Sequence, residues 1–200
     1  MNISGNNGLI INEEQIFAPS SMQLETLSIG DTKVLSVSVR NNAISDMSLP
    51  ATVRVVQCNQ NLLASLDGIP ATDTLRVLYA QDNQITNIQP KKWPKLTWID
   101  VTRNPLVILD TSENPDLRSV SAYEIPGLTV DFAKNPFLMR VDLGGNNMPA
   151  EMTDKLLIDL AGFNVINGVA ELWNNARSSK SDGAIKELES RGWSVLFHKV

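Results

Sequence analysis

The sequence contains few residues of the types that carry out catalysis. Its single histidine, His198, lies near the C-terminus of the 200-residue chain, and its single cysteine, Cys58, has no histidine near it in the sequence. A reactive cysteine needs a neighbouring base or positive charge that stabilises its thiolate. We therefore predict that Cys58 is a buried structural thiol and that His198 lies on the surface. No cysteines and histidines cluster with the spacing of a metal site.

Asp100 and Asp142 are the carboxylates whose spacing best fits acid–base chemistry. They occupy the same position in two repeats of the pattern described below, and two steps across a sheet would place them about 9.6 Å apart. Catalytic carboxylate pairs lie roughly 5–10 Å apart. The sequence gives no sign of a cleft, however, and such arrangements are common on polar surfaces. The glycine-rich stretch "DLGGNN" also lacks the lysine of a phosphate-binding loop. We predict no enzymatic activity and no cofactor.

The elements that position these residues follow a repeat. Apolar residues and an asparagine recur as apolar-x-x-apolar-x-apolar-x-x-Asn-x-apolar, with starts 19 to 22 residues apart. The repeats begin at Val34, Val53, Leu75, Leu96, Leu117 and Leu138. In the fifth repeat Ile125 replaces the asparagine. Spacing this regular predicts a repeat architecture.

This pattern resembles the leucine-rich repeat family, over roughly Val34 to Met148. The repeats of about 21 residues, with "NPDL" and "NPFL" turns, are similar to short repeats of bacterial and phage members. The resemblance implies an α/β solenoid in which each repeat adds one short strand to a parallel sheet on the concave face.

Each position of the repeat then has a predicted role. Positions four and six point into the core, and positions three, five, seven and eight are exposed, because side chains alternate along a strand. The asparagine at position nine can satisfy backbone groups of the turn that water does not reach. Stacked repeats would therefore form an asparagine ladder, which Ile125 interrupts with a locally different turn.

A solenoid needs a cap at each end of its sheet and core. We predict one continuous domain, with an N-terminal segment and cap at 1–33, repeats at 34–148 and a C-terminal cap at 149–200. The stretch "LETLSIGDTKVLSVSV" predicts a β-hairpin cap around residues 30–33. Residues 1–20 fit a loose tail, a further cap or an anchoring segment.

The C-terminal cap is predicted to mix helices and strands. "PAEMTDKLLIDLAG" predicts a helix with Pro149 at its start and Gly162 just past its end. "VAELWNN" predicts a strand with Ala170 and Leu172 pointing inward. A second short helix in "SDGAIKELESRG" and a last strand in "WSVLFHKV" follow.

The exposed positions of the repeats define the predicted binding surface. Tyr79 and Trp98 are diagonal neighbours within aromatic reach, and tyrosine and tryptophan are enriched where partners bind. The alternative, that these aromatics only cover their own sheet, stays open. The candidate binding residues on the concave face are Val77, Tyr79, Trp98, Asp100, Arg103, Tyr123, Arg140, Asp142 and Trp173.

Composition narrows the class of partner. The net charge is −5, the sequence pI is ≈ 4.9 and no stretch is strongly basic, which argues against nucleic-acid binding. The N-terminal residues contain neither a secretory signal nor an apolar run that could cross a membrane. We therefore expect synthesis in the cytoplasm without such a signal, which is compatible with later assembly into a virion.

These observations together favour a non-catalytic module for protein–protein recognition or assembly. Its partner would be another protein, such as a virion structural protein or a host surface component. The resemblance to phage-type repeats suggests a virion component, either a capsid decoration or a tail-associated protein. The alternatives are a bacterial host-interaction protein or effector and a glycan-binding adhesion module. The sequence does not indicate an oligomeric state.

Overall fold

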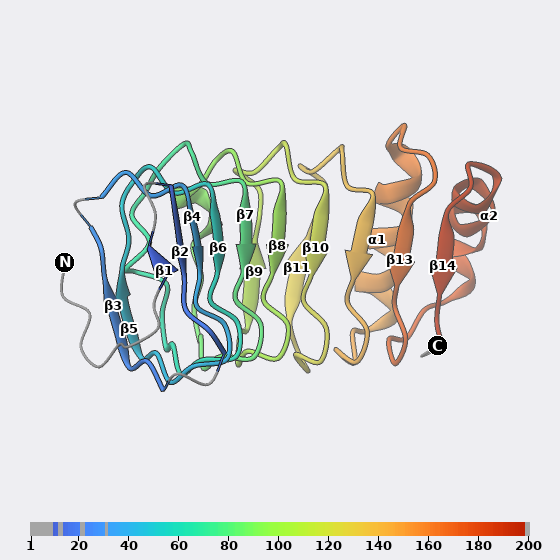
Figure 1. Cartoon of the computed structure of the whole chain (residues 1–200). Coiled ribbons are helices and arrows are strands. Elements are labelled where there is room, and N and C mark those ends of the chain that lie inside the picture. The colour runs from blue at the N-terminus through green and yellow to red at the C-terminus, as the bar shows by residue number, and fades with distance from the viewer. Residues whose placement is uncertain (1–9, 12–13, 21–22, 31, 199–200) are drawn as a thin grey trace.

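A computed structural model of the chain describes residues 10–11, 14–20, 23–30 and 32–198. Its largest element is a ten-stranded sheet, in which neighbouring strands are parallel except for the antiparallel pair β1–β2. Figure 1 shows the coils stacked in chain order. The strands, in sheet order, are β1 (Ile10–Ile11), β2 (Gln15–Phe17), β4 (Ser36–Ser38), β6 (Val55–Gln57), β7 (Val77–Tyr79), β8 (Trp98–Asp100), β10 (Ser119–Ser121), β12 (Arg140–Asp142), β13 (Val169–Glu171) and β14 (Ser194–Leu196).

The register of the sheet confirms the alignment of the repeats. Position four of each coil lies beside position four of the next, as in the pairs Val56 with Leu78 and Leu78 with Ile99. These side chains are fully buried. One apolar residue per three-residue strand therefore suffices to attach each coil to the core, since the neighbouring coils bury it from both sides.

The back of the solenoid is less regular than the sheet. It holds two short parallel pairs, β3 (Thr26–Ser28) with β5 (Asp46–Ser48) and β9 (Ile108–Asp110) with β11 (Thr129–Asp131), and the 3₁₀ helix η1 (Pro90–Lys92). The core lies between the sheet and this layer. Trp93, which follows η1, is almost completely buried in it, and its indole N–H donates to the carbonyl of Pro70 over 3.0 Å.

The predicted asparagine ladder is present. Asn83 accepts a hydrogen bond from the Leu63 amide of the preceding coil over 3.0 Å. Its own amide group donates to the carbonyls of Cys58 and Ala80 over 3.0 and 3.1 Å. Asn61 and Asn104 make the same kinds of bond. Each asparagine therefore ties its own turn to that of the preceding coil.

Ile125 interrupts the ladder, as predicted. With no asparagine at this position, the Leu106 amide of the preceding coil donates to the Asn104 carbonyl over 2.8 Å instead. Asn146 of the following coil then accepts from the Ile125 amide over 2.7 Å. The local turn therefore differs while both backbone amides stay satisfied.

A second set of asparagines stacks on the back, at the "NPxL" turns. Asn114 donates to the carbonyls of Pro90 and Trp93 over 3.1 and 2.8 Å, and Asn135 donates to that of Asn114 over 2.9 Å. Both asparagines are completely buried. The sequence pattern revealed these turns but not their hydrogen bonds.

The backbone turns sharply where it leaves each strand. Position eight adopts a left-handed conformation in every repeat, although only one of these residues is a glycine. Side chains rarely tolerate a positive φ, so the stacked turns hold this geometry against a local cost. The residues and their φ angles are Asn41 (54°), Gln60 (56°), Asp82 (57°), Arg103 (51°), Glu124 (55°) and Gly145 (74°).

The N-terminal hairpin differs from the prediction. The stretch around residues 30–33 joins β3 to β4, but β3 pairs with β5 on the back while β4 lies in the main sheet between β2 and β6. The hairpin prediction for this stretch was therefore wrong. An antiparallel pair does exist at this end of the sheet, but β1 and β2 form it. The parallel sheet itself already begins at β2.

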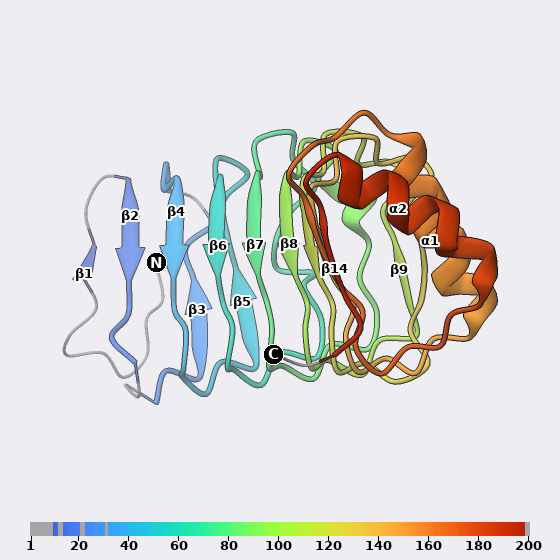
Figure 2. The same cartoon turned by 90° about the vertical axis from the view of Figure 1, so that its right-hand side faces the viewer.

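The C-terminal cap follows the predicted order of elements. Helix α1 (Ala150–Gly162) begins after Pro149 and contains Gly162 as its last residue, one position further than expected. Ala170 and Leu172 are completely buried, as predicted. The 3₁₀ helix η2 (Ser179–Ser181) leads into α2 (Asp182–Ser190). Figure 2 shows α1 and α2 side by side at this end, where they contact each other. Within the described ranges, no helix is long and apolar enough to cross a membrane.

Candidate binding surface

The outward side of the ten-stranded sheet, here called the sheet face, carries the predicted binding residues in rows. The register places position three of successive coils in one row, with Val77, Trp98, Ser119 and Arg140 side by side. Position five forms the next row. The other three candidates lie beyond the strand ends, Tyr123 and Trp173 at position seven and Arg103 at position eight. The position-five row contains Tyr79, Asp100, Ser121, Asp142 and Glu171.

Four of the candidates form two aromatic pairs. The rings of Tyr79 and Trp98 have centroids 6.0 Å apart and are tilted by 47°, and those of Tyr123 and Trp173 are 6.5 Å apart and tilted by 54°. All four side chains are half-buried. Each pair therefore holds its rings in fixed positions while leaving part of them open to a partner.

Trp173 also covers its own sheet. A Cβ added to Gly144 would lie 2.0 Å from the indole Nε1, and one added to Gly145 would lie 2.7 Å from the ring. The two glycines of "DLGGNN" thus leave room for this side chain. Trp173 therefore partly fits the alternative interpretation of the sequence, in which the aromatic side chains cover their own sheet.

Arg103 binds neighbours on both sides. Its guanidinium donates to Asp82 over 2.8 Å, to Glu124 over 3.3 Å and to the Tyr123 hydroxyl over 3.2 Å, and it also lies 5.4 Å from the centre of the Tyr123 ring. Asp82, Arg103 and Glu124 all occupy position eight of successive coils. Arg103 therefore fixes Tyr123 and ties three turns together, rather than presenting a free charge.

Asp100 and Asp142 lie in the position-five row with Ser121 between them. Burial raises the pKa of Asp142 to about 6, and the charges of Glu171 and Asp100 add to this effect. Burial also raises the pKa of Asp100, although its carboxylate accepts a hydrogen bond from the Thr102 amide over 3.0 Å. The sheet face thus carries one carboxylate, that of Asp142, whose charge changes with pH around pH 6.

Cys58 and His198 lie where the sequence predicted, one in the core and one on the surface. Cys58 is completely buried, and burial raises the pKa of its thiol to about 12, which confirms a structural thiol. His198 is exposed. In the described part of the chain no three His, Cys, Asp or Glu side chains lie close enough to hold a metal ion.

The structure adds a cavity that sequence reasoning missed. Ser119 stands between two much larger side chains of the same row, Trp98 and Arg140. This difference in size leaves a hollow of ≈ 320 Å³ on the sheet face. We call it the Ser119 notch. Its lining residues are Thr97, Trp98, Arg118, Ser119, Met139, Arg140, Asn167 and Val169.

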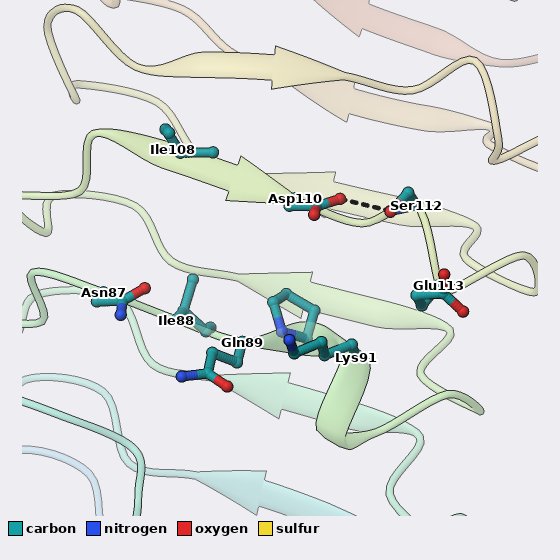
Figure 3. Close-up of a pocket in the computed structure, with 9 residues that line it drawn as sticks. Asn87, Ile88, Gln89, Lys91, Ile108, Asp110, Ser112 and Glu113 are labelled. Atoms are coloured by element: carbon teal, nitrogen blue, oxygen red, sulfur yellow. Dashed lines mark hydrogen bonds between the residues drawn. The ribbon is translucent and has the colours of Figure 1, made fainter.

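The back of the solenoid is also hollowed. A cavity of ≈ 240 Å³ lies between the segment 87–91 and strand β9 and is bordered by Ile108, Asp110 and Glu113. Figure 3 shows the side chains that line it. Ile108 is 58% exposed and its neighbour Val107 is 66% exposed. Sequence reasoning considered the strand residues of the sheet face and therefore did not identify this second apolar surface.

Comparisons with known proteins agree with the repeat architecture. No protein-family model and no curated protein matches the sequence. Among solved structures, an internalin from Listeria monocytogenes has 15% identity, a TM-score of 0.61 and 88% of this chain covered. A plant peptide hormone receptor in complex with RGF2 has 14% identity, a TM-score of 0.59 and 86% covered. A leucine-rich repeat protein of Leptospira interrogans has 15% identity, a TM-score of 0.53 and 88% covered.

The matches cover 62%, 34% and 61% of those three chains, so this chain spans only part of their length. At such low identity the likeness concerns the fold alone. The chain has the fold of leucine-rich repeat proteins, with the parallel sheet that the sequence predicted.

Proposed function

We propose that the protein is a non-catalytic recognition module that binds another protein through its sheet face. The observation that carries this proposal is the pair of half-exposed aromatic contacts, Tyr79 with Trp98 and Tyr123 with Trp173. Rigid aromatic side chains give a large binding area at a small cost in conformational entropy. The acidic row of the sheet face, with Asp100, Asp142 and Glu171, favours a protein over a nucleic acid, whose phosphates it would repel.

The proposed roles of the residues follow from their contacts. Tyr79 and Trp98, with Val77 beside Trp98 in its row, form the apolar anchor. Arg103 positions Tyr123, while Arg140 and the two aspartates form a polar rim. The use of this fold by a peptide hormone receptor in complex with RGF2 is consistent with peptide or protein binding.

The identity of the partner remains a separate proposal. A virion structural protein and a host surface component are both compatible with a protein-binding sheet face. Assembly into a phage particle rests on the resemblance of the repeats alone, and the structural comparisons do not add to it. A glycan partner would also stack on Trp98, so the two classes need an experiment that separates them.

Affinity capture from the natural source, read by quantitative mass spectrometry, tests the proposal. The bait would be the wild-type protein or the triple variant Tyr79→Ala, Trp98→Ala, Tyr123→Ala. The double variant Val107→Ala, Ile108→Ala on the back is the matched control, since it removes exposed apolar side chains from the opposite layer. Partners should be lost from the triple variant and retained by the control. The reverse pattern would refute the proposal, and glycan-array binding lost with Trp98→Ala alone would favour adhesion.

A further inference from the structure

The Ser119 notch combines buried polar groups with an open mouth. Ser119 is only 1% exposed, yet it lines a cavity of ≈ 320 Å³, which lies at the lower end of the roughly 300–1,000 Å³ range of ligand pockets. The wall of the notch also includes Val169 and Met139, and Met139 is 43% exposed. The notch therefore has apolar walls that can hold the stem of a side chain.

Two polar groups of the notch lack a partner. The Ser119 hydroxyl and the Trp98 indole N–H, on two of the residues that line the notch, are both buried and make no hydrogen bond to any described residue. The indoles of Trp93 and Trp193, in contrast, donate to the carbonyls of Pro70 and Val165 over 3.0 and 2.9 Å. Buried polar groups in native proteins are nearly always satisfied. Since an indole N–H can only donate, the missing partner of Trp98 must be an acceptor.

The charge at the mouth has the matching sign. Arg118 is exposed and, within the described residues, its guanidinium makes no hydrogen bond or ion pair, while Arg140 on the next strand is held by Glu171 over 3.0 Å. A free guanidinium binds carboxylates through charge-assisted hydrogen bonds. The acidic residues Asp100 and Asp142 occupy the neighbouring row, so they would keep a bound carboxylate at the arginine end of the strands.

We propose that the Ser119 notch binds an acidic side chain, a glutamate or aspartate, which a partner protein presents next to an apolar residue. The carboxylate would accept hydrogen bonds from Arg118 and from the unsatisfied donors of the notch, and the apolar neighbour would pack on Trp98 and Met139. This inference rests on the proposed function, because it assigns one contact of a partner on the sheet face.

Nuclear magnetic resonance of the ¹⁵N-labelled protein provides a direct test. The probe is a peptide, N-acetylated and amidated at its C-terminus, with the sequence Leu-Glu-Leu, and its matched control is Leu-Gln-Leu. The indole N–H signal of Trp98, assigned by its loss in Trp98→Phe, should shift saturably with the glutamate peptide. The signals of Trp93 and Trp193 should stay in place, because their N–H groups already have partners. The glutamine peptide should bind at least about tenfold more weakly, as expected for loss of a charged hydrogen-bond acceptor.

Two variants separate the notch from general effects. Arg118→Gln should abolish the preference for glutamate over glutamine, whereas Arg54→Gln, the same charge change on an exposed residue at the same repeat position three coils away, should leave it unchanged. No saturable shift, equal binding of both peptides or binding that requires a free C-terminus would overturn the proposal. If Arg118→Gln retains the native partner while the triple aromatic variant loses it, the notch inference fails and the proposed function stands.

Discussion

The indole of Trp173 occupies the space that a side chain on Gly144 would need, with Nε1 only 2.0 Å from the position of a Cβ. This contact explains why a glycine lies on the sheet face beside an aromatic residue. The same contact orients Trp173 toward Tyr123. The geometry of this aromatic pair therefore depends on the absence of a side chain at Gly144. The relation can be tested by adding a single methyl group.

Gly144→Ala should displace Trp173 and destabilise the protein by about 1–3 kcal/mol, the usual cost of overpacking. Urea unfolding and the near-ultraviolet circular dichroism of the aromatic pair would measure this. Gly183→Ala in α2 is the control, since its added Cβ would have no neighbour within 4 Å. That control should be neutral or stabilising by up to about 1 kcal/mol. Equal stability of Gly144→Ala and wild type would show that Trp173 moves freely.

The asparagine ladder predicts that replacing one of its asparagines destabilises the protein, although no buried apolar side chain is removed. Asn83→Ala should cost about 1–3 kcal/mol, because it leaves the buried Leu63 amide without a partner and removes the bonds from Asn83 to the Cys58 and Ala80 carbonyls. Chemical denaturation would give the difference in the free energy of unfolding. Asn87→Ala, at an exposed asparagine without a side-chain hydrogen bond in the described structure, should change stability little. A similar effect of both variants would argue against a structural ladder.

The burial of Cys58 predicts an unreactive thiol. A disulfide reagent attacks through the thiolate, and this side chain is completely buried with its pKa raised to about 12. The folded protein should therefore react far more slowly than the protein unfolded in guanidinium chloride. Absorbance after addition of the reagent measures both rates. Rapid reaction in the folded state would mean that the sheet opens around Val56 and Cys58.

The features that the sequence predicts are those that recur in every coil. Leu78 and Asn83 occupy repeat positions that have the same structural role in successive coils. The spacing of such residues therefore reveals both the strand and the ladder. The prediction of an N-terminal hairpin was wrong for a physical reason. Alternating residues on either side of Gly30 look the same whether two strands pair with each other or lie in the opposite layers of one coil. Only the partner strands, β5 for one and β6 for the other, distinguish these cases.

The Ser119 notch escaped prediction because a cavity depends on differences between neighbours across strands. The row Trp98, Ser119 and Arg140 is visible once the repeats are aligned, and a small residue between two large ones is its signal. The cavity beside Ile108 on the back has no such signal, because the back segments lack a common register.

The raised pKa of Asp142 predicts how stability depends on pH. Its ordinary value of 3.8 applies to the unfolded chain, whereas the folded value is about 6. The folded state therefore holds the proton of Asp142 more tightly than the unfolded chain does. Below the pKa of the unfolded chain, this carboxyl group does not lower the free energy of unfolding. As pH rises from about 4 to about 6, its ionisation progressively destabilises the folded protein. Asp142→Asn removes this cost and keeps an oxygen that can accept from the Gly144 amide.

Asp142→Asn should accordingly stabilise the protein by about 1–3 kcal/mol near pH 8 and make little difference near pH 4. Urea titrations of both proteins across this range give the comparison, and other carboxylates cancel because both proteins share them. Asp116→Asn, at a residue whose ion pair with Lys95 lies on the surface, is the control and should show at most a weak dependence. A stability difference for Asp142→Asn that stays constant with pH would show that the carboxylate ionises equally easily in the folded and unfolded chain, and the burial of its charge on the sheet face would then carry no cost.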